Sequence, residues 1–246
     1  MTQHHKEMNR KVSEPKESSP CEQGSQTIQL PYFNKFESIW EYEKLFLSGQ
    51  IDFVSFLGVR CPICDGEDCY RPMAPYWRYA IELFQEFKKK RIPIARFLCR
   101  RLRKTFSLLP IQLIPYVQYT VSAVIGTLFL GMGCWQRGQK GFHGAAMKVD
   151  EVDPESLVTP WLIACWLVAV VRGLRRSHAA LRRFYNLDGI HTSGAWEEAA
   201  GYFGAFGLRP KIERFSLLMD LVDRYSRATG QFLFGTSSQY RSSVHS

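Results

Sequence analysis

The stretch CPICDGEDCYRPMAPYWRYAIELFQEFKKKRIPIARFLCRRLRKTFSLLP, residues 61–110, is the part of the chain from which a fold can be predicted. Cys61 and Cys64 lie three positions apart at its start, and a turn of this length lets both thiolates point at one metal ion. Apolar residues alternate along 92–98, which predicts a strand, whereas the apolar positions of 76–84 fit either a strand or a helix. A metal-binding turn followed by candidate strands is typical of a zinc ribbon.

A zinc ribbon holds its ion with two cysteine pairs, and the second pair is incomplete here. Cys99 takes the first place of that pair, but position 102 is a leucine. Three interpretations follow. In the first, Cys69 replaces the missing thiolate, and zinc is bound by Cys61, Cys64, Cys69 and Cys99. In the second, the metal has been lost and packing alone holds the fold, and in the third the cysteines are unrelated buried residues.

Three motifs carry a resemblance to a known family. They are Cys61-Pro-Ile-Cys64-Asp-Gly, the segment YWRY at 76–79, and IPIARFLCRRLRKTFSLLPIQLIPYVQY at 92–119, of which TFSLLP is the most distinctive part. In this combination the chain resembles a bacterial domain of unknown function that carries an N-terminal zinc ribbon and is common in transposase-like and transposon-associated proteins. The resemblance implies a zinc ribbon, DNA binding and a role in a mobile element. The chain departs from the family's second cysteine pair at Leu102.

Basic residues are concentrated in the same region. Nine lysines and arginines and no acidic residue lie between positions 88 and 104, and their charge equals the net charge of +9 of the whole chain. They are Lys88, Lys89, Lys90, Arg91, Arg96, Arg100, Arg101, Arg103 and Lys104. Such a density favours contacts with the phosphates of duplex DNA, with the run 88–91 at the turn between two strands. The alternative is a solvated hairpin edge, whose charges deter pairing with other strands.

A second basic group lies on a long helix predicted from 160 to about 184, where Thr159 and Pro160 supply a cap and a first-turn proline. Its predicted DNA-binding residues are Arg172, Arg175 and Arg176, with Arg182 and Arg183 beyond them. At helical spacing most of these arginines share one face, opposite apolar residues that would face a core. This helix could lie against the DNA backbone or enter a groove, and the alternative is an ordinary solvated face.

Aromatic residues are frequent beside the basic segment. They are Tyr76, Trp77, Tyr79, Phe97, Phe106, Tyr116 and Tyr119. Exposed rings could stack on unpaired bases, as in proteins that bind single strands. Aromatic side chains at such spacing more often belong to a core.

The whole pattern predicts an α+β protein, in which a small β zinc-ribbon-like module is followed by a mainly α-helical region. We expect a disordered polar leader over 1–30, an N-terminal helix plus the ribbon-like module over 31–110, a helical domain over 111–228 and a polar tail over 229–246. Within the ribbon-like module, 36–48 is expected to form a helix and 51–57 a strand.

In the helical domain, prolines and small polar residues suggest where helices begin. Pro115 is expected to open a helix that runs to about 129, and Asp153, Ser193 and Pro210 are expected to start others. The stretch 131–150 contains five glycines and is expected to form a loop.

Neither membrane insertion nor secretion is indicated. The apolar stretches 121–135 and 161–171 are shorter than the roughly 20 residues that cross a bilayer, so we expect no membrane partner. Seven cysteines without a secretory signal argue against a disulfide framework and make the cytoplasm the expected compartment.

No pattern typical of an active site is present. A cut-and-paste transposase needs three converging carboxylates, and the acidic residues after position 110 fall in predicted loops and helix starts. We therefore expect a non-catalytic, DNA-binding accessory protein of a bacterial mobile element, which partners DNA and either a transposase or a second copy of itself. Two alternatives stay open. One is a transposase or nuclease whose carboxylates converge only in the fold; the other is an interaction module that partners a transposase through an exposed apolar patch at Phe129, Trp135 or Trp161.

Overall fold

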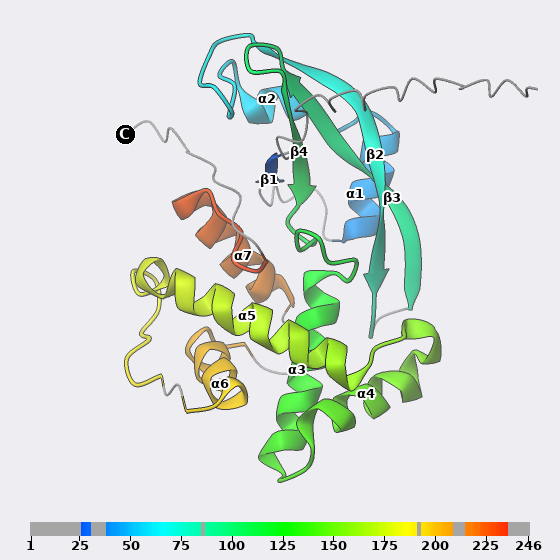
Figure 1. Cartoon of the computed structure of the whole chain (residues 1–246), viewed down its shortest axis with the longest axis vertical. Coiled ribbons are helices and arrows are strands. Elements are labelled where there is room, and N and C mark those ends of the chain that lie inside the picture. Colours follow the sequence, from blue (N-terminus) through cyan, green and yellow to red (C-terminus); the bar gives the residue numbers. More distant parts are fainter. Residues whose placement is uncertain (1–25, 31–37, 85–86, 191–192, 209–214, 236–246) are drawn as a thin grey trace, which may run out of the picture.

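The computed structural model describes residues 26–30, 38–84, 87–190, 193–208 and 215–235. Within them lie four strands and seven α-helices, which confirms the predicted α+β class. The strands are β1 (Gln26–Leu30), β2 (Tyr70–Glu82), β3 (Lys88–Cys99) and β4 (Lys104–Pro110). The helices are α1 (Ile39–Leu47), α2 (Phe53–Leu57), α3 (Val121–Gln136), α4 (Gly141–Val152), α5 (Pro160–Leu181), α6 (Ala195–Ala205) and α7 (Phe215–Thr229), with a short 3-10 turn, η1 (Pro154–Ser156), before α5. Figure 1 shows the sheet in one half of the molecule and α3 to α6 in the other.

The four strands form one mixed sheet in the order β1-β4-β3-β2. β2 and β3 pair antiparallel as a long hairpin, from Tyr70 opposite Cys99 to Glu82 opposite Lys88. β4 pairs antiparallel with β3, and β1 pairs parallel with β4. The expected strand 92–98 is confirmed within β3, and the ambiguous segment 76–84 lies mostly in β2.

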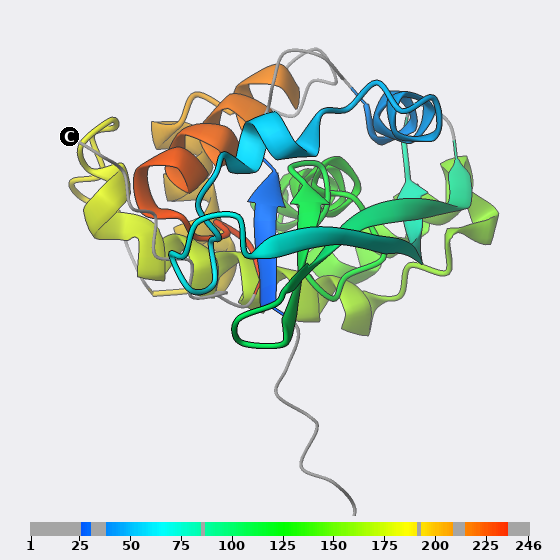
Figure 2. The same cartoon turned by 90° about the horizontal axis from the view of Figure 1, so that it is seen from above.

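One face of the sheet packs against α1 and α2, which lie on the same side of it in Figure 2. Phe97 of β3 and Phe106 of β4 stack at a centroid distance of 5.3 Å, and Phe97 also meets Phe53 of α2 at 6.3 Å. Side chains alternate between the two faces of a strand. The neighbours of these rings in sequence, Arg96 and Ser107, therefore belong to the opposite face.

Two expectations for the N-terminal part are wrong. The predicted leader includes β1, in which Ile28 and Leu30 are buried, and residues 1–25 lie outside the described residues. The predicted strand 51–57 is instead the short helix α2. Its start is fixed by Asp52, whose carboxylate accepts hydrogen bonds from the backbone N–H groups of Val54 and Ser55, so a capping residue outweighs the preference of aromatic residues for strands.

The long predicted helix is confirmed as α5, with the Thr159 hydroxyl accepting from the Leu162 N–H at its start. The helix expected at Pro115 begins at Val121 instead. Thr120 caps it, since its hydroxyl accepts a hydrogen bond from the Ala123 N–H. Asp153 precedes only the 3-10 turn. The helix expected from Ser193 begins at 195, and the expected start at Pro210 lies outside the described residues.

The predicted loop 131–150 is wrong, because the end of α3 and most of α4 occupy it. Its glycines allow helices to approach one another. A Cβ at Gly144 of α4 would lie 2.6 Å from the Cys134 Sγ of α3, and one at Gly131 would lie 2.5 Å from the Trp196 ring of α6. The absence of a side chain at these positions therefore serves close packing between helices.

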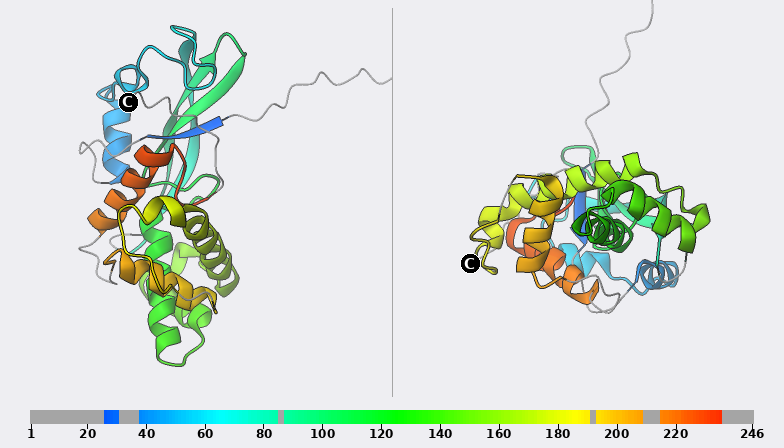
Figure 3. Two further views of the ribbon diagram at one scale, coloured as in Figure 1. Left: turned by 90° about the vertical axis from the view of Figure 1, so that its left-hand side faces the viewer. Right: turned by 90° about the horizontal axis from the view of Figure 1, so that it is seen from below.

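Two hydrophobic clusters fill the molecule. One lies under the sheet, and the other joins the helices, with α3 contacting α4, α5 and α6 (Figure 3, right). The two parts interlock, since Ile81 and Leu83 at the end of β2 belong to the helical cluster, whereas Phe232 belongs to the sheet cluster. The predicted polar tail from 229 is thus wrong at its start, where Phe232, Leu233 and Phe234 are all buried. No helix in the described part of the chain has the length and apolar character needed to cross a membrane.

Candidate metal centre and basic surfaces

Four cysteine side chains converge at the open end of the β2–β3 hairpin. Cys61 and Cys64 lie in the loop after α2, Cys69 directly precedes β2, and Cys99 ends β3. Their Sγ atoms all lie within 4.8 Å of one another. The Cys64 Sγ is 3.1 Å from that of Cys69 and 3.6 Å from that of Cys99, and the Sγ atoms of Cys69 and Cys99 are 3.8 Å apart.

These separations suit a tetrahedral metal ion. Sulfurs bound at about 2.3 Å from a zinc ion lie about 3.8 Å from one another, whereas a disulfide joins sulfurs at about 2.05 Å. An all-thiol set suits zinc and other soft ions. The four residues thus lie close enough to hold a metal ion, and Cys69 takes the place that the sequence lacks at Leu102. The interpretation of these cysteines as unrelated buried residues is wrong.

Backbone N–H groups hydrogen-bond to sulfurs at both cysteine turns. In the first turn, backbone N–H groups donate to the sulfurs of Cys61 and Cys64. In the second turn, the Leu102 N–H donates to the Cys99 Sγ at 3.4 Å. The second turn therefore keeps the hydrogen bond of a cysteine knuckle although it supplies one thiol. The Arg100 N–H donates to the Cys69 carbonyl at 2.7 Å and ties the two strands together beside the sulfurs.

The pKa shifts of Cys61, Cys64 and Cys69 differ in direction. Burial raises the pKa of Cys61 and of Cys69, and hydrogen bonds with the neighbouring thiols raise the pKa of Cys69 further. Burial acts in the same direction at Cys64, but hydrogen bonds from Cys69 and the Gly66 N–H outweigh it and lower the pKa of Cys64. The protein alone therefore favours a thiolate at Cys64 over thiolates at Cys61 and Cys69. A metal ion would bind the remaining thiols as thiolates and release their protons.

The nine basic residues of 88–104 do not form one patch. Four of them, 88–91, open β3, and four others, at 100, 101, 103 and 104, follow its last residue. A strand of this length spans roughly 40 Å, so the two groups lie at opposite ends of the sheet. The expectation that 88–91 forms the turn is wrong, because these residues pair with 79–82 of β2.

At the turn end of the hairpin, three of the four cations contact the protein itself. The Lys88 Nζ lies 4.8 Å from the centroid of the Trp40 ring, and the Lys89 Nζ lies 5.4 Å from that of Tyr79. The Lys90 Nζ pairs with the Glu43 carboxylate at 2.8 Å, and the Glu43 side chain is only 8% exposed. The contacts of Lys88 and Lys90 fix α1 to β3, and the contact of Lys89 joins β3 to β2. Arg91 is exposed, and neither an ion pair nor a ring contact is found for it among the described residues.

At the cysteine end, by contrast, Arg100, Arg101 and Arg103 are exposed and Lys104 is half-buried. None of these four forms an ion pair with a carboxylate of the described residues. The acidic residues of the first cysteine turn pair with a different cation, since Arg60 lies 3.5 Å from Asp65 and 3.9 Å from Glu67. The positive charge that follows β3 is therefore open to an external anion.

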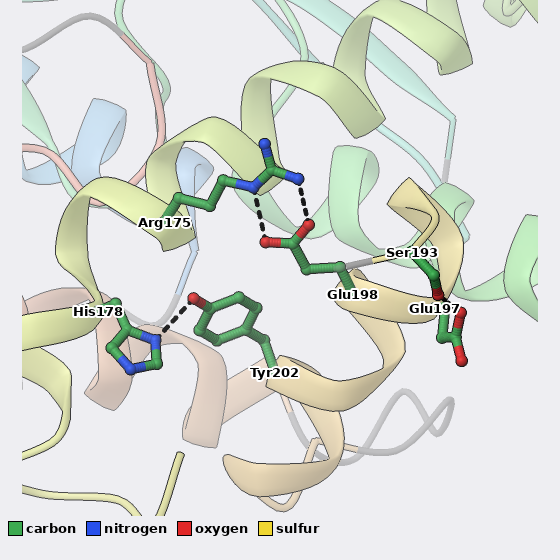
Figure 4. A network of polar contacts seen from close by, with 6 residues as sticks. All are labelled: Arg175, His178, Ser193, Glu197, Glu198 and Tyr202. Carbon is green, nitrogen blue, oxygen red and sulfur yellow. Dashed lines mark hydrogen bonds and ion pairs between the residues drawn. The ribbon is translucent and has the colours of Figure 1, made fainter. Parts of the chain in front are cut away.

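The arginines of α5 have contacts of their own. Arg175 forms a two-point ion pair with Glu198 of α6, with an Nε–Oε1 distance of 2.7 Å and an Nη2–Oε2 distance of 2.5 Å, and the Glu198 side chain is 0% exposed. Figure 4 shows this pair beside the contact between His178 Nδ1 and the Tyr202 hydroxyl, at 2.8 Å. A buried carboxylate depends strongly on its cation, so this pair joins α5 to α6.

Arg176 donates to the backbone carbonyls of Phe232, at 3.0 Å, and Gly235 and holds the segment after α7. Arg182 pairs with Asp188 at 3.5 Å. Of the three arginines predicted on α5 to bind DNA, only Arg172 is exposed without a contact of this kind in the described part of the chain.

The described residues do not assemble the carboxylates of a transposase. The four cysteines are the one group of three or more Cys, His, Asp or Glu side chains found there in metal-binding proximity. The apolar patch expected of an interaction module is also incomplete, since Phe129 packs against Phe203 at a centroid distance of 5.1 Å. Trp135 is partly exposed, and Trp161 is 75% exposed. Among the aromatic residues near the charges, Phe97, Phe106 and Tyr119 are buried, whereas Trp77, Tyr79 and Tyr116 are exposed.

Comparison with known proteins gives no match for this chain among protein-family models, curated proteins or solved structures. The predicted relation to transposon-associated proteins therefore stays a prediction.

Proposed function

We propose that the protein is a non-catalytic DNA-binding protein whose cysteine end, stabilised by a structural zinc ion, contacts the phosphates of duplex DNA. The observation that carries the proposal is that a four-thiol cluster lies next to exposed cations that form no ion pair with the described residues. Arg100, Arg101 and Arg103 follow the ligand Cys99 within four residues and have no carboxylate partner in the described residues.

In this proposal the zinc ion stabilises the fold of the cysteine end and takes no part in a reaction. Cys61, Cys64, Cys69 and Cys99 would hold it, and all four positions of a tetrahedral site would be filled by protein sulfurs, as in structural zinc sites. Holding Cys99 fixes the turn 100–103, so the arginines meet the phosphates from a rigid base. Preorganised cations lose less conformational entropy on binding than cations on a mobile loop.

The biological role follows from the sequence resemblance and is part of the proposal. A small DNA-binding protein without an assembled catalytic site would act in a mobile element as an accessory to a transposase. Contacts through phosphates would position it on DNA without reading the sequence directly.

The test compares two triple variants that remove the same charge from opposite ends of β3. One is Arg100→Gln/Arg101→Gln/Arg103→Gln, and its matched control is Lys88→Gln/Lys89→Gln/Arg91→Gln, which spares the Lys90–Glu43 pair. Binding of a fluorescent duplex is measured over a range of salt concentrations. We expect the first variant to reduce the slope of log K against log salt by roughly three units, since each phosphate contact contributes about 0.9, and the control to change it little. Equal slopes for both variants, or no duplex binding by the wild type at low salt, would refute the proposal.

A further inference from the structure

The face of the sheet that points away from α1 and α2 carries an open basin of about 530 Å³. A polar row crosses it, because Thr27 of β1 lies opposite Ser107 of β4, which in turn lies opposite Arg96 of β3. Arg78 of β2 and the loop after β4 complete the wall. The basin is therefore built from all four strands, and its volume lies within the roughly 300–1,000 Å³ of small-molecule sites.

Two guanidinium groups in this basin lack an acidic partner. Arg78 is half-buried on β2 and donates to the backbone carbonyls of Ile114, at 3.3 Å, and Val117. Arg96 donates at 3.4 Å to the Thr105 hydroxyl. Neither arginine forms an ion pair with a carboxylate of the described residues. Burial lowers the pKa of Arg78, so the protein pays a desolvation cost that a bound anion would offset.

Hydroxyl groups connect the two arginines. The Tyr76 side chain hydrogen-bonds with Arg78 and with Ser107, and Ser107 lies opposite Arg96. Ser107 is buried in the centre of β4, and Thr105 and Leu109 lie on the same face of the strand. Hydroxyl donors beside guanidinium forks are the groups that bind phosphate oxygens.

Aromatic rings line the rim of the same basin. Tyr116 is 81% exposed and is held at a φ of 64°, in the left-handed region that non-glycine residues rarely occupy. Tyr79 is also exposed, with the Lys89 ammonium 5.4 Å from its centroid. An exposed ring that the backbone presents in a strained conformation is a common feature of binding sites. Such rings stack on nucleic-acid bases irrespective of their sequence.

We propose that this basin binds one unpaired nucleotide, with its phosphate between Arg78 and Arg96 and its base stacked on Tyr116. The nucleotide could be a free nucleoside monophosphate or a unit of a single strand, since both present the same phosphate and base. This site is separate from the duplex contact at the cysteine end and does not depend on it.

The test measures binding to the full-length protein of inorganic phosphate, adenosine monophosphate and a short fluorescent single-stranded oligonucleotide. Arg96→Gln should weaken binding of all probes by about ten-fold or more, because it removes a charged donor from the phosphate. Tyr116→Gly should weaken binding of the nucleotide and the oligonucleotide but leave inorganic phosphate unchanged, and it relieves the backbone strain, so the fold is kept. The matched control is Arg183→Gln, an exposed arginine just beyond α5, which should change nothing.

The two sources of the nucleotide are separated by competition. Displacement of the oligonucleotide by adenosine monophosphate at equal or lower concentration assigns a free nucleotide, and tighter binding of the oligonucleotide assigns a strand. The proposal is overturned if the wild type binds none of the probes, or if Arg96→Gln and Tyr116→Gly bind them as the wild type does. The triple variant Arg100→Gln/Arg101→Gln/Arg103→Gln should keep nucleotide binding, so failure of one proposal does not imply failure of the other.

Discussion

The two ends of the β2–β3 hairpin carry four basic residues each in or next to β3, yet they are held by different chemistry. At the turn end, Lys88 and Lys90 contact α1, and Ile81 and Leu83 enter the helical core. At the other end, the strands meet only the short helix α2, through Phe53 and Phe97, and four thiols converge beside it. A count of basic residues in the sequence therefore does not identify a nucleic-acid-binding surface. Cations that already stabilise the fold have less to offer an external anion.

The largest expected effect comes from removing the proposed metal ion, which would separate the two ends most clearly. Chelation, or Cys99→Ser, should expose the backbone N–H groups of 58–70 and 99–104 to hydrogen exchange while the turn end stays protected by the helical core. Closed zinc sites contribute on the order of 10 kcal/mol to the folding of small peptides, so a large fall in the melting temperature is expected. Cys165→Ser is the control, because Cys165 is exposed on α5, outside the cluster. Equal loss of protection at both ends would contradict the comparison.

A smaller effect is expected at the turn end from Lys90→Met. The change leaves the buried Glu43 carboxylate without its cation, which should cost about 1–2 kcal/mol in the free energy of unfolding measured by denaturant titration. Adding Glu43→Gln should restore most of that loss, since no buried charge then remains. Arg91→Met removes the same charge from an exposed position on the same strand and should cost little. A loss from Lys90→Met no larger than that from Arg91→Met would show that the turn end does not use this pair.

The smallest effect concerns Glu82, the partner of Lys88 in the β2–β3 ladder. Its carboxylate turns to the start of α3, where it accepts from the hydroxyls of Thr120, at 3.0 Å, and Ser122, at 3.1 Å. Burial raises the pKa of Glu82, although these hydrogen bonds oppose the change. The folded state therefore holds the Glu82 proton more tightly than the unfolded state does.

It follows that Glu82 favours folding most below the unfolded pKa of about 4.3 and loses this contribution as the pH rises through its folded pKa. We expect Glu82→Gln to remove that pH dependence, with a difference below about 1 kcal/mol in melting experiments from acidic to neutral pH. Glu155→Gln, an exposed acid in the 3-10 turn, is the control. A wild type whose stability relative to Glu82→Gln rises over the same range would reverse the sign and contradict the argument.

Local signals in the sequence predicted several elements well. The alternation at 92–98 gave β3, and Thr159 followed by a proline gave the start of α5, because alternation and capping act over a few residues. The glycines of 131–150 misled for a tertiary reason, since they make room for Cys134 and Trp196 of other helices. β1 was missed because its partner strand lies about eighty residues further along the chain.

Some of the functional residues could likewise be predicted from local sequence signals, and others could not. The spacing of Cys61 and Cys64 indicated a metal-binding turn, but only the fold brings Cys69 to Cys99. The pairing of Glu43 and Glu198 with a lysine and an arginine has no signal in the sequence, because nothing there distinguishes a buried acid from an exposed one on a helix. Arg78 gives a faint signal, because it is the one charged residue among the aromatic and apolar residues of 76–81.

By itself, the sequence determined which segments form strands and helices where capping residues or alternation were present, the positive net charge, and the residue types available to bind a metal. The tertiary structure decided which of these groups meet. It brought four thiols together and matched Lys90 and Arg175 with buried carboxylates, whereas Arg78 and Arg96 have no carboxylate partner among the described residues. The reason is physical: an ion pair or a metal site depends on distances of a few ångströms between residues far apart in sequence, and only the packed chain sets those distances.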